Sequence, residues 1–286
     1  MLIFEEYRQH TEELFAAALK AADPGYAVRT YLHRDGRFVQ IGDASFEIGQ
    51  GRVFLVSVGK AALPMAEAAY EVLGDDLFAA DVISKRGGQK ADNSPLRILP
   101  NVQLMEGSHP VPGVDSVRST AQVIKQLSQT TEDDLVICLI SGGASALLTQ
   151  PAVSLSDWQI LIHALLASGC TINELNTVRR QVDRVKGGGL ARIAAPARCV
   201  SLILSDVIGN PLEAIGSGPT VILSESPAEA LTILNRYEIA DVIDAAAYQR
   251  ITDALMGQES AEESAPANSE IFIVGDVRMA AQAAMA

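Results

Sequence analysis

The sequence predicts an α/β fold: a Rossmann-like, doubly wound parallel sheet with helices on both faces. Short apolar runs, typical of buried parallel strands, recur along its 286 residues. Helical patterns, with apolar residues every three or four positions, separate several of these runs. Glycine-rich or polar stretches directly follow several runs, at the place where open α/β sheets bind ligands.

The first elements follow from the spacing of their apolar residues. Residues 4–22 carry apolar side chains near one helical face, and Asp23-Pro24-Gly25 is expected to end this helix. Residues 38–41 and 45–48 alternate on either side of Gly42-Asp43, which predicts a hairpin. Residues 53–58, with the continuous apolar run VFLVSV, are expected to form the first strand of the main sheet.

Strands and helices then alternate. Further strands are expected at residues 81–84, 102–106, 135–140, 199–204 and 271–274. Helices are expected between Lys60 and Leu73 and at residues 114–128, 156–167, 171–183 and 227–255. Alternation of this kind builds a parallel sheet through crossover connections.

A polar segment divides the chain near its end. Residues 257–270, GQESAEESAPANSE, are expected to form a linker or an exposed loop after a domain that spans 1–256. A strand and a clipped helix follow within 271–286, and these two elements cannot bury their own apolar faces. The sequence therefore predicts that 271–286 begins an incomplete second α/β domain, truncated after its first strand and helix.

Composition excludes several classes of function. With 22 Lys and Arg against 35 Asp and Glu, the formal charge is −13, which disfavours binding to nucleic acid or to anionic membrane surfaces. Cys138, Cys170 and Cys199 show no CxxC spacing, so zinc and a disulfide framework are not expected. The chain lacks an apolar signal-peptide core and any run of membrane-spanning length, and a cytoplasmic location is expected.

Lys60 follows the first strand of the main sheet, in the sequence Val58-Gly59-Lys60. A cation at the start of the next helix is slightly unfavourable in the field of the helix dipole. Its placement is explained if it neutralises a bound phosphate or carboxylate. The alternative is a surface lysine whose stem covers apolar side chains.

Two glycine-rich loops are candidate anion sites. Ser141 to Ser145 includes Gly142 and Gly143, whose amides can turn toward one anion, although a plain tight turn would use the same residues. Lys186-Gly187-Gly188 is preceded by Asn176 and Arg179 and has a flexible hinge as its alternative explanation.

Two more segments carry candidate site residues. Asp206 comes at the end of an apolar strand, where it can bind Mg²⁺ or accept a hydroxyl proton, or simply cap a helix. Ser217-Gly218 offers a further anion nest. His109, in a proline-bounded loop, is either a substrate contact or a structural residue.

Five motifs in order resemble the type II glycerate kinases, or glycerate 2-kinases. They are GKAALPMAEAA at 59–69, GSHPVPG at 107–113, LISGGASALL at 139–148, NELNTVRRQVDRVKGGGLA at 173–191 and LILSDVIGNPLEAIGSGPT at 202–220. The resemblance implies transfer of the γ-phosphoryl group of ATP to the 2-hydroxyl of D-glycerate, giving 2-phosphoglycerate, with Mg²⁺. It also implies that Lys60 and Asp206 are catalytic, and that the SGG and KGG loops line the phosphate and substrate pocket.

The chain departs from the family pattern in two ways. Asn210 stands where the family usually has an acidic residue, and the family's glycine-rich C-terminal signature is absent. One alternative is therefore a catalytically incomplete fragment that only binds substrate, as a homodimer or with a partner chain that supplies the missing domain. The other is a hydroxypyruvate reductase, although the chain lacks the GxGxxG dinucleotide fingerprint.

Overall fold

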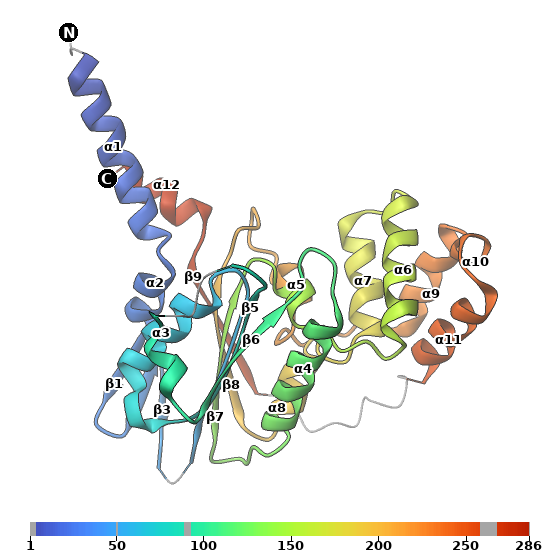
Figure 1. Ribbon diagram of the computed structural model, residues 1–286, viewed down its shortest axis with the longest axis horizontal. Coiled ribbons are helices and arrows are strands. Elements are labelled where there is room, and N and C mark those ends of the chain that lie inside the picture. The colour runs from blue at the N-terminus through green and yellow to red at the C-terminus, as the bar shows by residue number, and fades with distance from the viewer. Residues whose placement is uncertain (1–3, 50, 89–92, 258–267, 286) are drawn as a thin grey trace.

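A computed structural model of the chain describes residues 4–49, 51–88, 93–257 and 268–285. At its centre lies a parallel sheet with the strand order β6-β5-β4-β7-β8-β9 (Figure 1). The strands are β4 (Val53–Val58), β5 (Leu77–Lys85), β6 (Val102–Gly107), β7 (Leu135–Ser141), β8 (Arg198–Leu204) and β9 (Ser269–Gly275). The chain reverses direction across the sheet between β4 and β7, which makes this pair the switch point of the fold.

Helices cover both faces of the sheet, so the predicted Rossmann-like α/β fold is confirmed. On one face, α2 (Pro24–Tyr31) and α3 (Ala62–Leu73) enclose an apolar core that includes Leu55 and Leu139. On the other face, α4 (Val114–Leu127), α5 (Ala144–Leu147) and α8 (Gly189–Ala194) enclose a second core. A small antiparallel sheet of β1 (Leu32–Asp35), β2 (Phe38–Ile41) and β3 (Ala44–Glu47) extends the first core.

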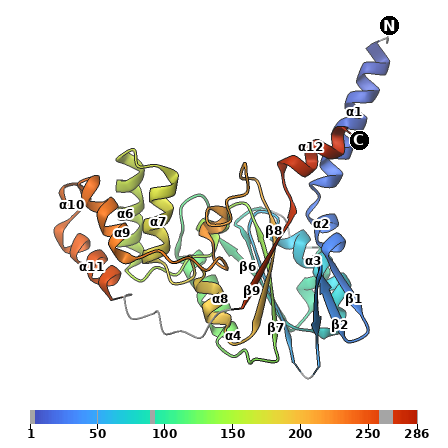
Figure 2. The same cartoon turned by 180° about the vertical axis from the view of Figure 1, so that it is seen from behind.

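A separate group of helices lies to one side of the sheet (Figures 1 and 2). This helical group consists of α6 (Leu155–Ala167), α7 (Ile172–Val182), α9 (Pro227–Arg236), α10 (Ile239–Val242) and α11 (Ala245–Met256), packed around Trp158 and Leu165. At the opposite side, α1 (Phe4–Ala21) projects from the body and α12 (Val277–Met285) packs against it. None of the described helices is both long enough and apolar enough to cross a membrane.

The first helix ends before Asp23-Pro24-Gly25 as expected, and two other local features differ from the expectations. The chain does leave α1 near Asp23, but Asp23 caps a new helix, α2, in which Pro24 occupies the first turn. The helix expected over 227–255 is three helices, α9 to α11. Glu238 breaks it with a left-handed backbone (φ 49°), and Asp244 begins α11 by accepting hydrogen bonds from Ala246 and Ala247.

The strand expected at the start of residues 271–286 belongs to the main sheet. β9 pairs in parallel with β8, from Ser269 opposite Cys199 to Gly275 opposite Leu204. It is therefore the sixth strand of the same sheet, and it also contacts α2. Of the linker expected at 257–270, residues 258–267 lie outside the described residues.

Candidate active site

The carboxyl ends of four strands meet at one cavity of about 360 Å³. Lys60 follows β4, His109 follows β6, Gly143 and Ser145 follow β7, and Asp206 follows β8. Arg179 reaches the same cavity from α7 in the helical group. The fold thus brings together six of the residues that the sequence singled out, from five separate segments.

Glycine at positions 142 and 143 allows the loops to approach closely. A Cβ atom on Gly142 would collide with the carboxylate of Asp206. Gly143 adopts a φ of 92°, and a Cβ there would lie 3.2 Å from the His109 ring and 3.4 Å from Cγ of Lys60. The loop after β7 therefore lies between the side chains contributed by β4, β6 and β8.

Hydrogen bonds fix the ends of β4 and β7 against each other at the switch point. The Lys60 amide donates to the Gly142 carbonyl at 2.9 Å. The Ser141 hydroxyl accepts from the Ala61 amide at 3.1 Å and donates to the Val58 carbonyl at 3.3 Å. Ser141 is buried and positions Lys60, whereas the Lys60 side chain is exposed at the cavity.

Two adjacent arginines of α7 serve different purposes. Arg180 is buried and forms an ion pair with Glu225, with a further hydrogen bond to the Glu213 carbonyl at 3.1 Å. Arg179 is half-buried at the cavity, and burial lowers its pKa from the ordinary value. Within the described chain, Arg179 forms no hydrogen bond or ion pair, so its guanidinium is available to a ligand.

Polar side chains support the wall behind Ser145. The Ser217 hydroxyl lies 3.3 Å from the Ser145 hydroxyl and 3.4 Å from Oδ1 of Asn176. Both Ser217 and Asn176 are buried. Ser217 therefore contacts Ser145 from behind, Asn176 holds Ser217, and neither of these two predicted site residues is in the cavity lining.

The Lys186 loop lies beneath the site. The Lys186 side chain is buried, and its ammonium donates to the carbonyls of Ser145 at 2.8 Å and Leu148 at 2.9 Å. The amides of Gly187 and Gly188 donate to the carbonyls of Ser217 and Gly218 at 3.1 and 2.7 Å. These donors, which the sequence suggested for anions, instead hold the loops of the site together.

His109 lies between charges of both signs. Burial lowers its pKa, the positive charges of Lys60 and Lys85 lower it further, and the carboxylate of Asp206 opposes them. The ring is therefore neutral near pH 7. Asp206 is the only carboxylate among the residues that line this cavity, and no cluster of three or more candidate metal ligands occurs in the described chain.

The sequence reasoning missed the apolar part of the cavity. Trp158 and Ile162 from α6, together with Ala146 and two prolines of the His109 loop, complete its lining. Gln159 of α6 also donates to the Pro112 carbonyl at 2.8 Å, which ties the helical group to this loop. Trp158 is the single tryptophan of the chain, and this was the one sequence feature that could have drawn attention to the apolar lining. The helical pattern around Trp158 is equally typical of a core residue.

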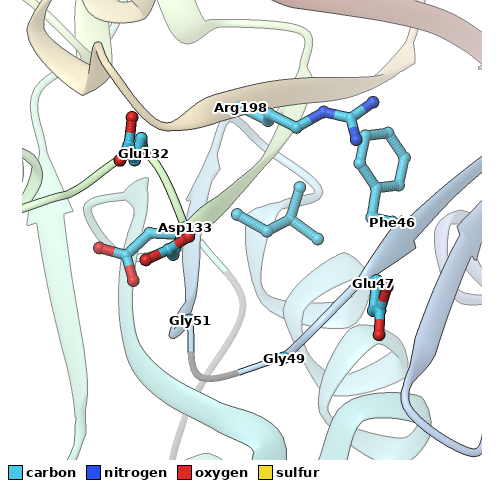
Figure 3. A pocket seen from close by; sticks show the side chains of 9 residues that line it. Phe46, Glu47, Gly49, Gly51, Glu132, Asp133 and Arg198 are labelled. Atoms are coloured by element: carbon cyan, nitrogen blue, oxygen red, sulfur yellow. The ribbon is translucent and has the colours of Figure 1, made fainter.

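A second cavity of about 280 Å³ lies at the opposite, amino-terminal edge of the sheet (Figure 3). Arg198 stacks over the Phe46 ring there, 4.3 Å from its centre, and pairs with Glu270. Glu132 and Asp133 lie across the opening. No residue that the sequence singled out belongs to this cavity.

Comparison with known proteins places the chain in a family. A family described as a domain of unknown function (DUF4147) matches residues 10–252. The glycerate kinase of Danio rerio is 40% identical over 262 residues, which are 88% of this chain and 52% of that protein. The D-glycerate 2-kinase of Thermotoga maritima is 38% identical over 278 residues, which are 96% of this chain and 60% of that protein.

A solved structure supports the same relationship. The crystal structure of a glycerate kinase from Thermotoga maritima superposes with a TM-score of 0.80 at 32% identity, covering 98% of this chain and 61% of that one. The chain therefore spans about half to three-fifths of the length of these relatives.

Proposed function

Because the chain belongs to the DUF4147 family, the family of the glycerate 2-kinases, we propose that its carboxyl-edge cavity binds D-glycerate for phosphorylation by ATP. The product would be 2-phosphoglycerate. The family relationship supports the reaction class, and the geometry of the cavity supports the assignment of roles to residues.

The observation that carries this proposal is the charge of the cavity. Lys60 and Arg179 bring two cations to it, and neither side chain has a hydrogen-bond or ion-pair partner among the described residues. Among the lining residues that the structure describes, Asp206 supplies the single carboxylate. On a chain with a formal charge of −13, such an excess of positive groups favours a small anionic ligand.

Each residue then has a defined task in phosphoryl transfer, which depends mainly on positioning and charge neutralisation. Arg179 binds the carboxylate of glycerate, and Lys60 neutralises negative charge on the phosphoryl group during its transfer. The 2-hydroxyl oxygen forms a bond to the γ-phosphorus as the bond from that phosphorus to the bridging oxygen of ADP breaks. ADP leaves with the electron pair of the broken bond, and the hydroxyl proton passes to solvent water.

The donors present fit Mg²⁺ that arrives with the nucleotide. Mg²⁺ in kinase sites is commonly held by one or two carboxylates and by phosphate oxygens, and Asp206 supplies one carboxylate. When bound, the ion would neutralise negative charge on the phosphates. Ser145 and the loop at Gly142 and Gly143 remain as the groups that approach the anionic oxygens.

The reaction is tested by ³¹P NMR of the 286-residue chain incubated with ATP, Mg²⁺ and D-glycerate. We expect a resonance of 2-phosphoglycerate that is absent without the acid. Formation of 3-phosphoglycerate would contradict the proposal that the 2-hydroxyl is phosphorylated. Absence of transfer, together with NADH oxidation on addition of hydroxypyruvate, would replace the proposal by the reductase alternative.

Arg179→Met is expected to weaken D-glycerate binding by roughly 10- to 100-fold, the size of a lost hydrogen bond to a charged group. Isothermal titration calorimetry measures this affinity. Arg118→Met is the matched control, because Arg118 is exposed on α4, away from the cavity lining. Equal weakening in both variants would show a general charge effect and would remove Arg179 from the binding site.

A further inference from the structure

A second lysine stands at the same edge of the sheet as Lys60. β5 ends at Lys85, which is followed by Arg86, Gly87 and Gly88. β5 lies between β4 and β6, so this basic turn is flanked by the strands that carry Lys60 and His109. The five sequence motifs that resemble the glycerate 2-kinases do not include this turn.

The register brings the segments that carry the two lysines next to each other. Val58 of β4 is opposite Ile83 of β5, and the Gly59 amide donates to the Ile83 carbonyl at 3.2 Å. Lys60 follows in the turn after β4, and Lys85 is the last residue of β5. Adjacent strands lie about 5 Å apart, so the turn with Lys60 begins beside the end of β5.

The charges of both lysines also act on the His109 ring. Apart from burial, the groups that lower its pKa are Lys60 and then Lys85. The electrostatic effect of a charge falls with distance, so this agrees with the neighbouring strand ends given by the register. Lys85 itself is exposed and lies outside the lining of the cavity.

A buried carboxylate fixes the Lys85 turn to the His109 loop. Asp115, at the start of α4, is 7% exposed and pairs with the Arg86 guanidinium at 2.7 Å. It also accepts a hydrogen bond from the Ser108 hydroxyl at 2.9 Å, while the Arg86 amide donates to the Gly107 carbonyl at 2.9 Å. The charge of Arg86 is thereby neutralised, and the turn is held in place.

The Lys85 ammonium, unlike the Arg86 guanidinium, has no ion-pair partner among the described residues. Throughout residues 4–49, 51–88, 93–257 and 268–285, no ion pair or side-chain hydrogen bond involves Lys60 or Lys85. Two neighbouring cations repel each other unless an anion lies between them. A chain of phosphates carries charge on successive groups and can bridge two ammonium groups, whereas a single carboxylate presents one charge to them.

We propose that Lys85 binds the phosphate chain of the phosphoryl donor, which it holds jointly with Lys60 from neighbouring strand ends. Arg179, from the helical group, remains for the carboxylate of the acceptor. The ligand class of the Lys85 subsite is a polyphosphate, as in a nucleoside triphosphate. This inference rests on the proposed function for the identity of the donor.

Calorimetric titration of the full chain with inorganic triphosphate, with ATP and with D-glycerate tests the inference. Lys85→Gln is expected to weaken triphosphate and ATP binding by roughly 10- to 100-fold and to change glycerate affinity less than twofold. Lys85→Arg, which keeps the charge, is expected to retain most of the affinity. Lys125→Gln, on the exposed last turn of α4, is the control and should bind all three ligands normally.

The outcomes separate this inference from the proposed function. Unchanged triphosphate binding by Lys85→Gln, or a loss confined to glycerate, overturns the role of Lys85 even if the wild type phosphorylates glycerate. A wild-type chain that does not bind triphosphate overturns it as well. Triphosphate binding that depends on Lys85, in a chain that transfers no phosphate, supports the subsite and contradicts only the proposed reaction.

Discussion

Replacement of Lys60 by methionine is expected to lower the rate of glycerate phosphorylation roughly 100- to 1,000-fold, the usual cost of removing one group that stabilises transition-state charge. The side chain is exposed at the cavity and forms no hydrogen bond or ion pair with the residues that the structure describes, while the structural hydrogen bond at this position comes from its backbone amide. Methionine keeps that amide and most of the length of the side chain, so the fold should remain intact.

The measurement is a steady-state rate with varied ATP and glycerate, beside a thermal unfolding curve. We expect the loss mainly in kcat, because charge on the transferring group develops in the transition state. Lys125→Met is the matched control for removal of a surface lysine. A Lys60→Met variant with a wild-type rate would remove this residue from the mechanism.

Replacement of Asp81 by asparagine is expected to change how stability depends on pH. Asp81 lies in the middle of β5 between Val56 and Gln103 and is fully buried. Neither of its carboxylate oxygens has a hydrogen-bond partner in the part of the chain that the structure describes. Burial raises its pKa from 3.8 to about 7. An unfolded chain ionises this group at an ordinary aspartate pKa, so between about pH 4 and pH 7 the folded state binds more protons.

Stability contributed by protonated Asp81 is therefore present below pH 4 and is lost as the pH rises to about 7. A difference of about three pKa units corresponds to about 4 kcal/mol in the free energy of unfolding. In urea unfolding from pH 4 to pH 8, the free energy of unfolding of Asp81→Asn should rise relative to that of the wild type by up to this amount. Above pH 7 the difference should stay constant. Asp75→Asn, at an exposed position, should show a small effect, and a pH-independent difference for Asp81→Asn would contradict the prediction.

The convergence of the site was predictable because of the topology of parallel sheets. Lys60, Gly143 and Asp206 each follow an apolar run, and the carboxyl ends of parallel strands share one edge. Once the sheet was expected, these residues were expected to lie near one another. The Arg179 contribution rested instead on its place in a family motif, because α7 belongs to the helical group and not to the sheet.

Other features depend on contacts that a residue pattern does not encode. A lysine followed by three glycines can bind a ligand or can hold neighbouring loops, and the sequence does not distinguish the two. In this protein the Lys186 ammonium donates to the carbonyls of Ser145 and Leu148. The pairing of β9 with β8 likewise depends on contacts in the folded chain, where β9 also packs against α2. The polar segment that precedes β9 in the sequence gives no indication of this pairing. Lys85 stands out only when the register shows that the end of β5 lies beside the strand that precedes Lys60.

A crystal structure of this chain with D-glycerate tests most directly whether the converging strand ends form the binding site. We predict density for the acid in the 360 Å³ cavity, with its carboxylate on Arg179 and its hydroxyls beside Gly143 and Lys60. Density for the acid beside Phe46 and Arg198 at the opposite edge of the sheet, with the carboxyl-edge cavity holding only solvent, would contradict the proposed site.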